Sequence, residues 1–138
     1  MVDLQSQYYK IKNELDNAVL NVLDSAAYIN VPEVKLFQQE LENYLGVKHV
    51  IPCANGTDAL QIALMSLDLK EGDEVITADF TFAATVEVIH LLKLKSVLVD
   101  VDYDTFTIDP EKIKAAITPK TKAIIPVHLF GQCANMEE

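Results

Sequence analysis

The sequence has few of the residue types that mark special classes of protein. It contains no tryptophan, 2 cysteines, 4 glycines and 5 prolines among 138 residues, and 50% of its residues are hydrophobic. This composition excludes collagen-like and disordered chains and is typical of a packed globular domain. Cys53 and Cys133 lie far apart and in no CxxC arrangement. We therefore expect two buried, reduced thiols.

Basic residues and long apolar runs are also scarce. The 11 basic residues face 21 acidic ones, which gives a formal net charge of −10. Such a field repels nucleic acid phosphates and anionic lipid, so we expect neither as a partner. No apolar run approaches the roughly 20 residues that cross a bilayer, and residues 1–5 carry no signal pattern. We expect a cytoplasmic protein.

Two amphipathic helices are expected at the start of the chain. Apolar residues recur at helical spacing in a first stripe, made of Leu4, Tyr8, Ile11, Leu15, Val19 and Val22. A second stripe, Val34, Phe37, Leu41 and Leu45, is opened by Pro32 and closed by Gly46. We expect the apolar face of the first helix to be covered by a partner subunit or by further chain, since it is too large to leave in water.

After residue 48, short apolar runs alternate with helical patterns about ten residues long. The runs are residues 49–53, 73–77, 96–101 and 123–129. One helix is expected after Asn55, with Leu60, Ile62, Ala63, Leu64 and Leu67 on its buried side. Two others are expected over 82–92 and after a cap at Asp109. This alternation favours a mostly parallel sheet with helices on both faces. The fold class is therefore α/β. No helical pattern develops after residue 129, so we expect the last strand to lack its covering layer and the domain to be incomplete.

Residues 55–60, Asn-Gly-Thr-Asp-Ala-Leu, join a predicted strand to a predicted helix. A helix N-terminus leaves backbone N–H groups unpaired and is a natural phosphate site. Gly56 allows close approach of a ligand and Thr57 adds a hydroxyl. The alternative is structural: Asn55 or Thr57 caps the helix, and Gly56 serves a tight turn. Spacing alone leaves both open, because the segment is neither a P-loop nor a dinucleotide fingerprint.

Two further segments follow predicted strands, where ligands collect in an open α/β sheet. Residues 79–85 hold Phe80 and Phe82, either of which could lie on a planar cofactor or belong to the core. Residues 126–132 hold His128, an acid, base or ligand donor, or else a structural histidine. No metal-ligand spacing, nucleophile elbow or Cys-His pairing is present, so we expect no metal.

Six segments, taken in order, resemble the DegT/StrS family: residues 1–4, 44–49, 55–60, 72–76, 80–85 and 126–132. Members of this family are pyridoxal-phosphate-dependent sugar aminotransferases with the aspartate aminotransferase fold. The resemblance implies that residues 1–138 are the N-terminal portion of the large domain of a fold-type I transferase. Residues 53–64 also resemble the branch that acts on UDP-linked 3-keto-glucuronates.

The resemblance implies roles for four residues of the chain. Gly56 and Thr57 would hold the phosphate of pyridoxal 5'-phosphate with Asp58 beside them, and the ring of Phe82 would lie over the pyridine. The implied reaction moves an amino group, commonly from glutamate, to a nucleotide-linked keto-sugar in polysaccharide or glycan biosynthesis. Family members build their sites across dimer interfaces, so a homodimer is also implied.

The resemblance places the Schiff-base lysine and the aspartate that pairs with the pyridine nitrogen downstream of residue 132, so we assign no catalytic residue here. Val31 stands where the family usually has glycine, which alters a loop near the sugar site. Two alternatives remain within the family: a non-catalytic product that docks on a full-length partner, and a dehydratase with histidine at the lysine position. A Rossmann-type nucleotide binder is disfavoured because no G-x-G-x-x-G follows a strand.

Overall fold

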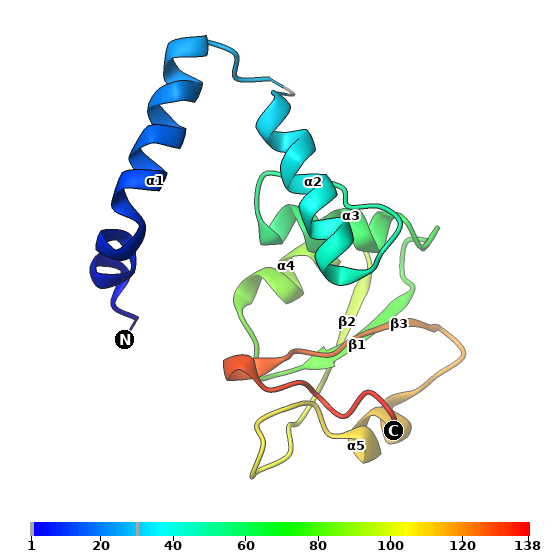
Figure 1. The fold of residues 1–138 in the computed structure, drawn as a ribbon. Helices are drawn as coiled ribbons and strands as arrows, with labels where there is room; N and C mark the ends of the chain where they lie inside the picture. The colour runs from blue at the N-terminus through cyan, green and yellow to red at the C-terminus, as the bar shows by residue number, and fades with distance from the viewer. Residues whose placement is uncertain (1, 30) are drawn as a thin grey trace. The chain divides into compact units, whose positions relative to one another are not determined.

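The structure, a computed structural model, describes residues 2–29 and 31–138. The chain divides into two compact units, Met1–Pro52 and Cys53–Glu138. The first unit is helical, and the second holds a three-stranded sheet with its helices (Figure 1). No helix in the described part of the chain is long and apolar enough to cross a membrane.

The first unit consists of the two predicted helices, α1 (Leu4–Ser25) and α2 (Pro32–Leu45). Asp3 caps α1 by accepting the backbone N–H of Ser6 at 3.0 Å. Pro32 occupies the first turn of α2, and Gly46 ends the helix with a φ of +66°, a left-handed conformation that glycine adopts without strain. Neither helix contains a buried side chain.

The second unit is built on a parallel sheet in the order β2-β1-β3, where β1 is Glu74–Ala78, β2 is Lys95–Val99 and β3 is Thr121–Ile125. All five residues of β1 are buried. A central parallel strand is covered on both faces, which explains why this segment is mostly apolar beyond Glu74; its one polar side chain there, Thr77, donates to the Ile125 carbonyl at 3.0 Å. The predicted α/β class with two leading helices is confirmed.

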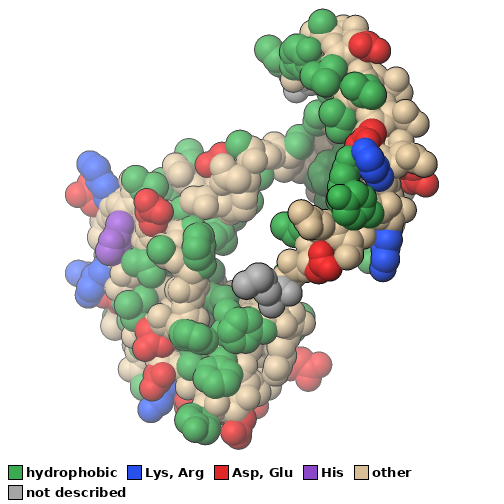
Figure 2. All heavy atoms as spheres, turned by 90° about the vertical axis from the view of Figure 1, so that its left-hand side faces the viewer, with side chains coloured by type: hydrophobic (Ala, Val, Ile, Leu, Met, Phe, Trp, Pro, Cys, Tyr) green, Lys and Arg blue, Asp and Glu red, His purple; other side chains and the backbone are tan. Residues whose placement is uncertain are grey.

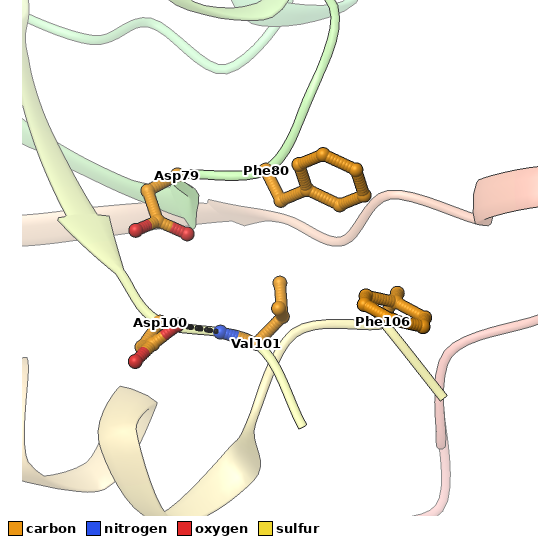
Figure 3. A pocket seen from close by; sticks show the side chains of 5 residues that line it. All are labelled: Asp79, Phe80, Asp100, Val101 and Phe106. Carbon is orange, nitrogen blue, oxygen red and sulfur yellow. Dashed lines mark hydrogen bonds between the residues drawn. The ribbon is translucent and has the colours of Figure 1, made fainter. Parts of the chain in front are cut away.

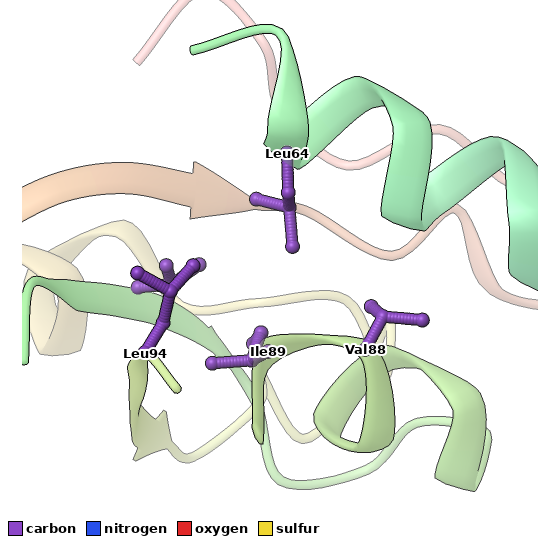
Figure 4. Close-up of a cluster of buried hydrophobic side chains, with 5 residues drawn as sticks. Leu64, Val88, Ile89 and Leu94 are labelled. Carbon is purple, nitrogen blue, oxygen red and sulfur yellow. The ribbon is translucent and has the colours of Figure 1, made fainter. Parts of the chain in front are cut away.

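One face of the sheet is covered by α3 (Gly56–Met65) and α4 (Ala83–Leu91). Figure 4 shows Leu64 of α3 above Val88 and Ile89 of α4, with Leu94 beside them; these four and Val75 of β1 form one core cluster. Val75, Val88 and Ile89 are fully buried. Burying an aliphatic side chain of this size contributes about 1.5–3 kcal/mol, so this cluster is the main source of stability on that face.

The opposite face packs against α5 (Pro110–Ala116) and the segment that leads into it. Its core consists of Ile76, Ala78, Val99, Ile108 and Ala134. Asp109 caps α5 as predicted, accepting the N–H of Glu111 at 2.8 Å. Helices therefore cover both faces, although Ile124 of β3 remains 44% exposed.

A buried carboxylate joins the three strands at their amino ends. Glu74 accepts hydrogen bonds from the Thr118 hydroxyl at 2.6 Å and from Lys95 Nζ at 2.9 Å. The Thr118 hydroxyl, and after it Lys95, lower the pKa of the Glu74 carboxyl below its ordinary value. The sheet is thereby held together at the end opposite to the predicted ligand site.

Four expectations from the sequence are wrong in detail. Residues 49–53 form no strand, because α2 side chains bind the backbone there: Val50 N–H donates to Glu42 and Gln38 donates to the Val50 carbonyl. The last strand stops at Ile125 and is followed by a short 3-10 turn, Leu129–Gly131. Ile62 and Leu67, expected on the buried side of α3, are exposed. Both cysteines are free, as expected, but exposed.

Candidate functional site

The carboxyl ends of the strands form one edge of the sheet. β1, β2 and β3 end at Ala78, Val99 and Ile125, and the N–H of Asp79 donates to the Val99 carbonyl at 2.9 Å, which holds the first two ends together. The amino ends carry the ion pair of Glu74 and Lys95. Ligands of open α/β sheets bind outside the carboxyl ends of the strands, so a ligand site is expected along this edge.

The N-terminus of α3 points toward that edge. Leu64, near the C-terminal end of α3, packs against Leu94, which directly precedes β2. The C-terminal end of α3 therefore lies at the amino ends of the strands, and Gly56 lies at the opposite end of the helix. Only four residues separate the end of β1 from the start of α4, so the first turn of α4 also lies at the carboxyl edge. The topology thus places Thr57 and Phe82 at the same end of the sheet.

The first turn of α3 leaves two backbone donors available. Asn55, in extended conformation, accepts the N–H of Asp58 through Oδ1 at 2.9 Å, and its carbonyl accepts the N–H of Ala59 at 3.1 Å. The N–H groups of Gly56 and Thr57 bond to nothing in the described part of the chain. The positive end of the helix dipole lies at these same groups.

The surroundings of Gly56 and Thr57 suit an anion. A Cβ added at Gly56 would meet nothing within 4 Å, so the space next to this backbone is open. The hydroxyl of the half-buried Thr57 side chain can act as a third donor. Two N–H groups and a hydroxyl at a helix N-terminus match the acceptor oxygens of a phosphate. The donor set therefore fits a phosphorylated cofactor.

Asp58, unlike Gly56 and Thr57, is hydrogen-bonded to the helix cap through both its backbone and its side chain. Its N–H is already bound to Asn55, and its Oδ2 accepts a hydrogen bond from Asn55 Nδ2 at 3.3 Å. Asp58 is half-buried. The structure thus shows Asp58 paired with the helix cap, so its side chain and its backbone offer no free donor to a phosphate.

Phe82 and Phe80 have different surroundings. Phe82 precedes α4 in extended conformation and is 78% exposed, which rules out the core alternative for this ring within the described chain. Phe80 packs against Phe106 and Phe130, with ring centroids 5.9 and 6.5 Å apart. Phe82 is therefore the more exposed of the two rings, at 78% against 48% for Phe80.

A cavity of about 320 Å³ opens at the carboxyl edge beside Phe80. In Figure 3 the carboxylates of Asp79 and Asp100 lie at one end and the rings of Phe80 and Phe106 at the other, with Val101 between them. Gly56, Thr57 and Phe82 do not line it. Sequence reasoning did not single out Asp100, although it directly follows β2. No sequence pattern indicates that Phe106 lines this cavity, because its position depends on a left-handed backbone conformation with φ of 56° at Phe106 itself.

Two of the three histidines, His90 and His128, have structural partners. Nδ1 of His128 accepts the N–H of Ala134 at 3.1 Å, and this bond ties the turn after β3 to the core. His90 Nε2 lies 2.9 Å from Ser96 Oγ. Within residues 2–29 and 31–138, no group of three His, Cys, Asp or Glu side chains could hold a metal ion.

Comparisons with known proteins agree with the resemblance. Residues 9–138 match the model of the DegT/DnrJ/EryC1/StrS aminotransferase family. The chain is 49% identical over 136 residues to UDP-2-acetamido-2-deoxy-3-oxo-D-glucuronate aminotransferase of Pseudomonas aeruginosa, covering 99% of this chain and 38% of that relative.

Two solved structures share the fold. An aminotransferase of the same family from Brucella abortus superposes with a TM-score of 0.93 at 44% identity, covering 99% of this chain and 38% of the other. The structure of ntda from Bacillus subtilis, with bound cofactor PMP, superposes with a TM-score of 0.88 at 38% identity, covering 93% and 29%. The chain spans less than two fifths of the length of each of these relatives.

Proposed function

The chain belongs to the DegT/DnrJ/EryC1/StrS aminotransferase family, and on that premise we propose that it carries the coenzyme-phosphate end of a pyridoxal-phosphate-dependent sugar aminotransferase. The amino acceptor is a nucleotide-linked keto-sugar of polysaccharide or glycan biosynthesis, and the donor is glutamate. A UDP-linked 3-keto-glucuronate is the preferred acceptor, because the relative at 49% identity is named for that substrate.

The observation that carries this proposal is the first turn of α3. Its unpaired Gly56 and Thr57 N–H groups lie at the carboxyl edge of a parallel sheet, in a family whose member from Bacillus subtilis was solved with bound PMP. We assign the phosphate of the coenzyme to these two N–H groups and to the Thr57 hydroxyl. The ring of Phe82, which is exposed, would lie over the pyridine, and Asp58, hydrogen-bonded to Asn55, would stand beside the phosphate.

When bound, the coenzyme supplies an electron sink for the carbon that gains or loses the amino group. The residues of this chain bind and orient it. The N–H groups of Gly56 and Thr57 would hold the phosphate dianion, and the ring of Phe82 would keep water off one face of the pyridine. We assign no proton transfer to the residues of this chain.

We also propose that the protein is a cytoplasmic homodimer. The apolar stripe of α1 supports the dimer: Leu4 is 68% exposed and Leu15 41%. Such a stripe needs a covering surface. Figure 2 shows apolar side chains spread over the surface of both units. The exposed free thiols of Cys53 and Cys133 suit a reducing compartment.

The proposal is tested by a pair of ligands that differ only in the phosphate. The chain is titrated with pyridoxal 5'-phosphate and with pyridoxal, and binding is followed by coenzyme absorbance. We expect the phosphorylated form to bind more tightly, because hydrogen bonds to a charged group contribute about 1.5–3 kcal/mol each. Equal affinity for both ligands would contradict the proposed phosphate site. It would favour the alternative in which the chain docks on a full-length partner and binds no coenzyme.

A pair of variants locates the phosphate. Gly56→Pro deletes one N–H at a helix position that tolerates proline, as Pro32 and Pro110 show at the starts of α2 and α5. The extended conformation of Asn55 is compatible with a following proline. Gly56→Ala keeps the N–H and serves as the control. We expect Gly56→Pro to bind pyridoxal 5'-phosphate about tenfold or more weakly than Gly56→Ala, and to bind pyridoxal equally.

A further inference from the structure

Each of the three loops that leave the carboxyl edge of the sheet contributes one residue to a cluster of phenylalanines. Phe80 follows β1, Phe106 follows β2 and Phe130 follows β3. The ring of Phe80 is central: its centroid lies 5.9 Å from that of Phe106 and 6.5 Å from that of Phe130, at distances that aromatic pairs favour. These three residues, the phenylalanine cluster, therefore join the three loops to one another.

The backbone of the phenylalanine cluster is strained. Phe106 and Phe130 have φ of 56° and 54°, in the left-handed region where a Cβ crowds the backbone. For each of them this cost is of the same order as the gain from one aromatic pair. The rings are also poorly buried, since Phe80 is 48%, Phe106 45% and Phe130 84% exposed. Stability alone therefore does not explain the cluster, and strain of this kind is concentrated at functional sites.

Phe80 connects the phenylalanine cluster to the proposed coenzyme site. The loop of residues 79–82 joins β1 to α4, and Phe82 at its end carries the ring assigned to the pyridine. The first residue of the loop is fixed by its backbone, because the N–H of Asp79 donates to the Val99 carbonyl at 2.9 Å. The second residue, Phe80, is fixed by its ring contacts within the cluster. The course of the loop toward Phe82 thus depends on the cluster.

We propose that Phe80 is a positioning residue for the coenzyme ring: through the phenylalanine cluster it holds the 79–82 loop so that Phe82 faces the pyridine. The inference rests on the proposed function, since it takes Phe82 over the pyridine as given. Phe80 acts through Phe82 and touches no reacting atom. Loss of the cluster should therefore weaken binding of the pyridine ring and leave the phosphate contacts at the start of α3 intact.

The variants separate positioning from stability. Phe106→Gly removes one ring of the cluster together with its left-handed strain, because glycine adopts positive φ freely. Phe106→Ala removes the ring and keeps the strain, so its thermal midpoint should be the lower of the two. Phe80→Tyr retains the central ring, whose 48% exposure leaves room for a hydroxyl, and is the conservative control. Phe82→Ala removes the ring assigned to the pyridine.

Each variant of the whole 138-residue chain is titrated with pyridoxal 5'-phosphate and with pyridoxal. We expect Phe106→Gly to weaken binding of both ligands by the same factor, about threefold to tenfold, since the pyridine ring is common to both. Added to Phe82→Ala, Phe106→Gly should have no further effect, because the cluster acts through Phe82. Phe80→Tyr should bind both ligands as wild type does. Without ligand, amide hydrogen exchange of residues 80–82 should be faster in Phe106→Gly, while exchange in β1 is unchanged.

Two results would overturn the inference alone. If Phe106→Gly weakens binding equally with and without the Phe82 ring, the cluster does not act through Phe82. If Phe106→Gly leaves both affinities and the exchange of residues 80–82 as in wild type, the cluster does not position the loop. Failure of the proposed function gives a different result: the wild-type chain binds neither ligand, or Phe82→Ala binds both as tightly as wild type. In that case the inference falls together with the proposed function.

Discussion

The two units of the chain differ in how much of their apolar surface they bury. In Cys53–Glu138 the apolar residues of β1 and α4 are buried, and Val75, Ile76, Val88 and Ile89 are fully inaccessible. In Met1–Pro52 the helices are equally regular, but neither contains a buried side chain. Regular secondary structure therefore forms in both, while a core of its own forms only in the second.

This contrast shows which unit has a hydrophobic core of its own. The second unit has a sheet with helices on both faces and holds the candidate phosphate site on the same rigid framework. The first unit has local signals, a capped start at Asp3 and a glycine end at Gly46, which specify helices but not what covers them. Stability and the candidate site should thus depend on the second unit, and assembly on the first.

The largest expected effect compares two isoleucines. Ile89→Ala removes a fully buried side chain, whereas Ile11→Ala changes one that is 47% exposed. We expect Ile89→Ala to lower the free energy of unfolding by about 2–5 kcal/mol and Ile11→Ala to change it by less than about 0.5 kcal/mol. Urea unfolding measures both. Equal losses would mean that α1 belongs to the same cooperative core.

The next effect compares two aspartate caps of the same chemistry. Asp109→Ala removes the cap of α5, which packs on the sheet, and should lower the free energy of unfolding by about 1 kcal/mol. Asp3→Ala removes the cap of α1 and should reduce the helical circular dichroism signal without moving the cooperative transition. A shift of that transition by Asp3→Ala would break the distinction between the units.

The smallest effect concerns pH. The folded pKa of Glu74 is lowered, chiefly by the Thr118 hydroxyl and then by Lys95, so its stabilising contribution is present above the ordinary value of 4.5 and is lost as the pH falls through the lowered pKa. The thermal midpoint of wild type should therefore fall more steeply than that of Glu74→Gln as the pH is taken below 4.5.

Asp16 of α1 provides the matched control for this pH dependence. Lys12 lowers the pKa of its carboxyl as well, but both side chains are exposed and the pair lies on a helix without a core. Exposed pairs contribute little, so Asp16→Asn should leave the pH dependence of the midpoint unchanged. If the midpoint depends on pH in the same way in wild type and in Glu74→Gln but differently in Asp16→Asn, then Asp16, and not Glu74, contributes the pH-dependent stability.

Much of the fold could be predicted because its signals are local. Pro32, Gly46 and Asp109 mark helix ends through their own backbone and side-chain chemistry, and the alternation after residue 48 gave the parallel sheet. Residues 49–53 were mistaken for a strand because apolar composition does not reveal whether a neighbouring strand is available. Gln38 and Glu42 take the hydrogen bonds that a neighbouring strand would have taken.

The candidate site was predictable to the same extent. Gly56 and Thr57 begin a helix, and Phe82 lies between a strand and a helix, so these segments could be identified from the sequence. The strand expected before Gly56 is absent, so the place of Gly56 and Thr57 relative to the sheet needed the structure. The role of Asn55 in holding Asp58 needed distances, and the cavity beside Phe80 needed the left-handed turn at Phe106. Residues brought together by a turn far along the chain leave no periodic signal.

The central claim is that this chain holds the phosphate of the coenzyme and does not supply the lysine that binds it covalently. The most direct measurement is to mix the chain with pyridoxal 5'-phosphate, reduce with borohydride, and map modified lysines by mass spectrometry. Lys95 lies at the amino end of the sheet and Lys12 and Lys35 lie on the leading helices. We predict scattered, substoichiometric labelling. One stoichiometric adduct at a single lysine, with amino transfer from glutamate to a keto-sugar nucleotide, would contradict the claim.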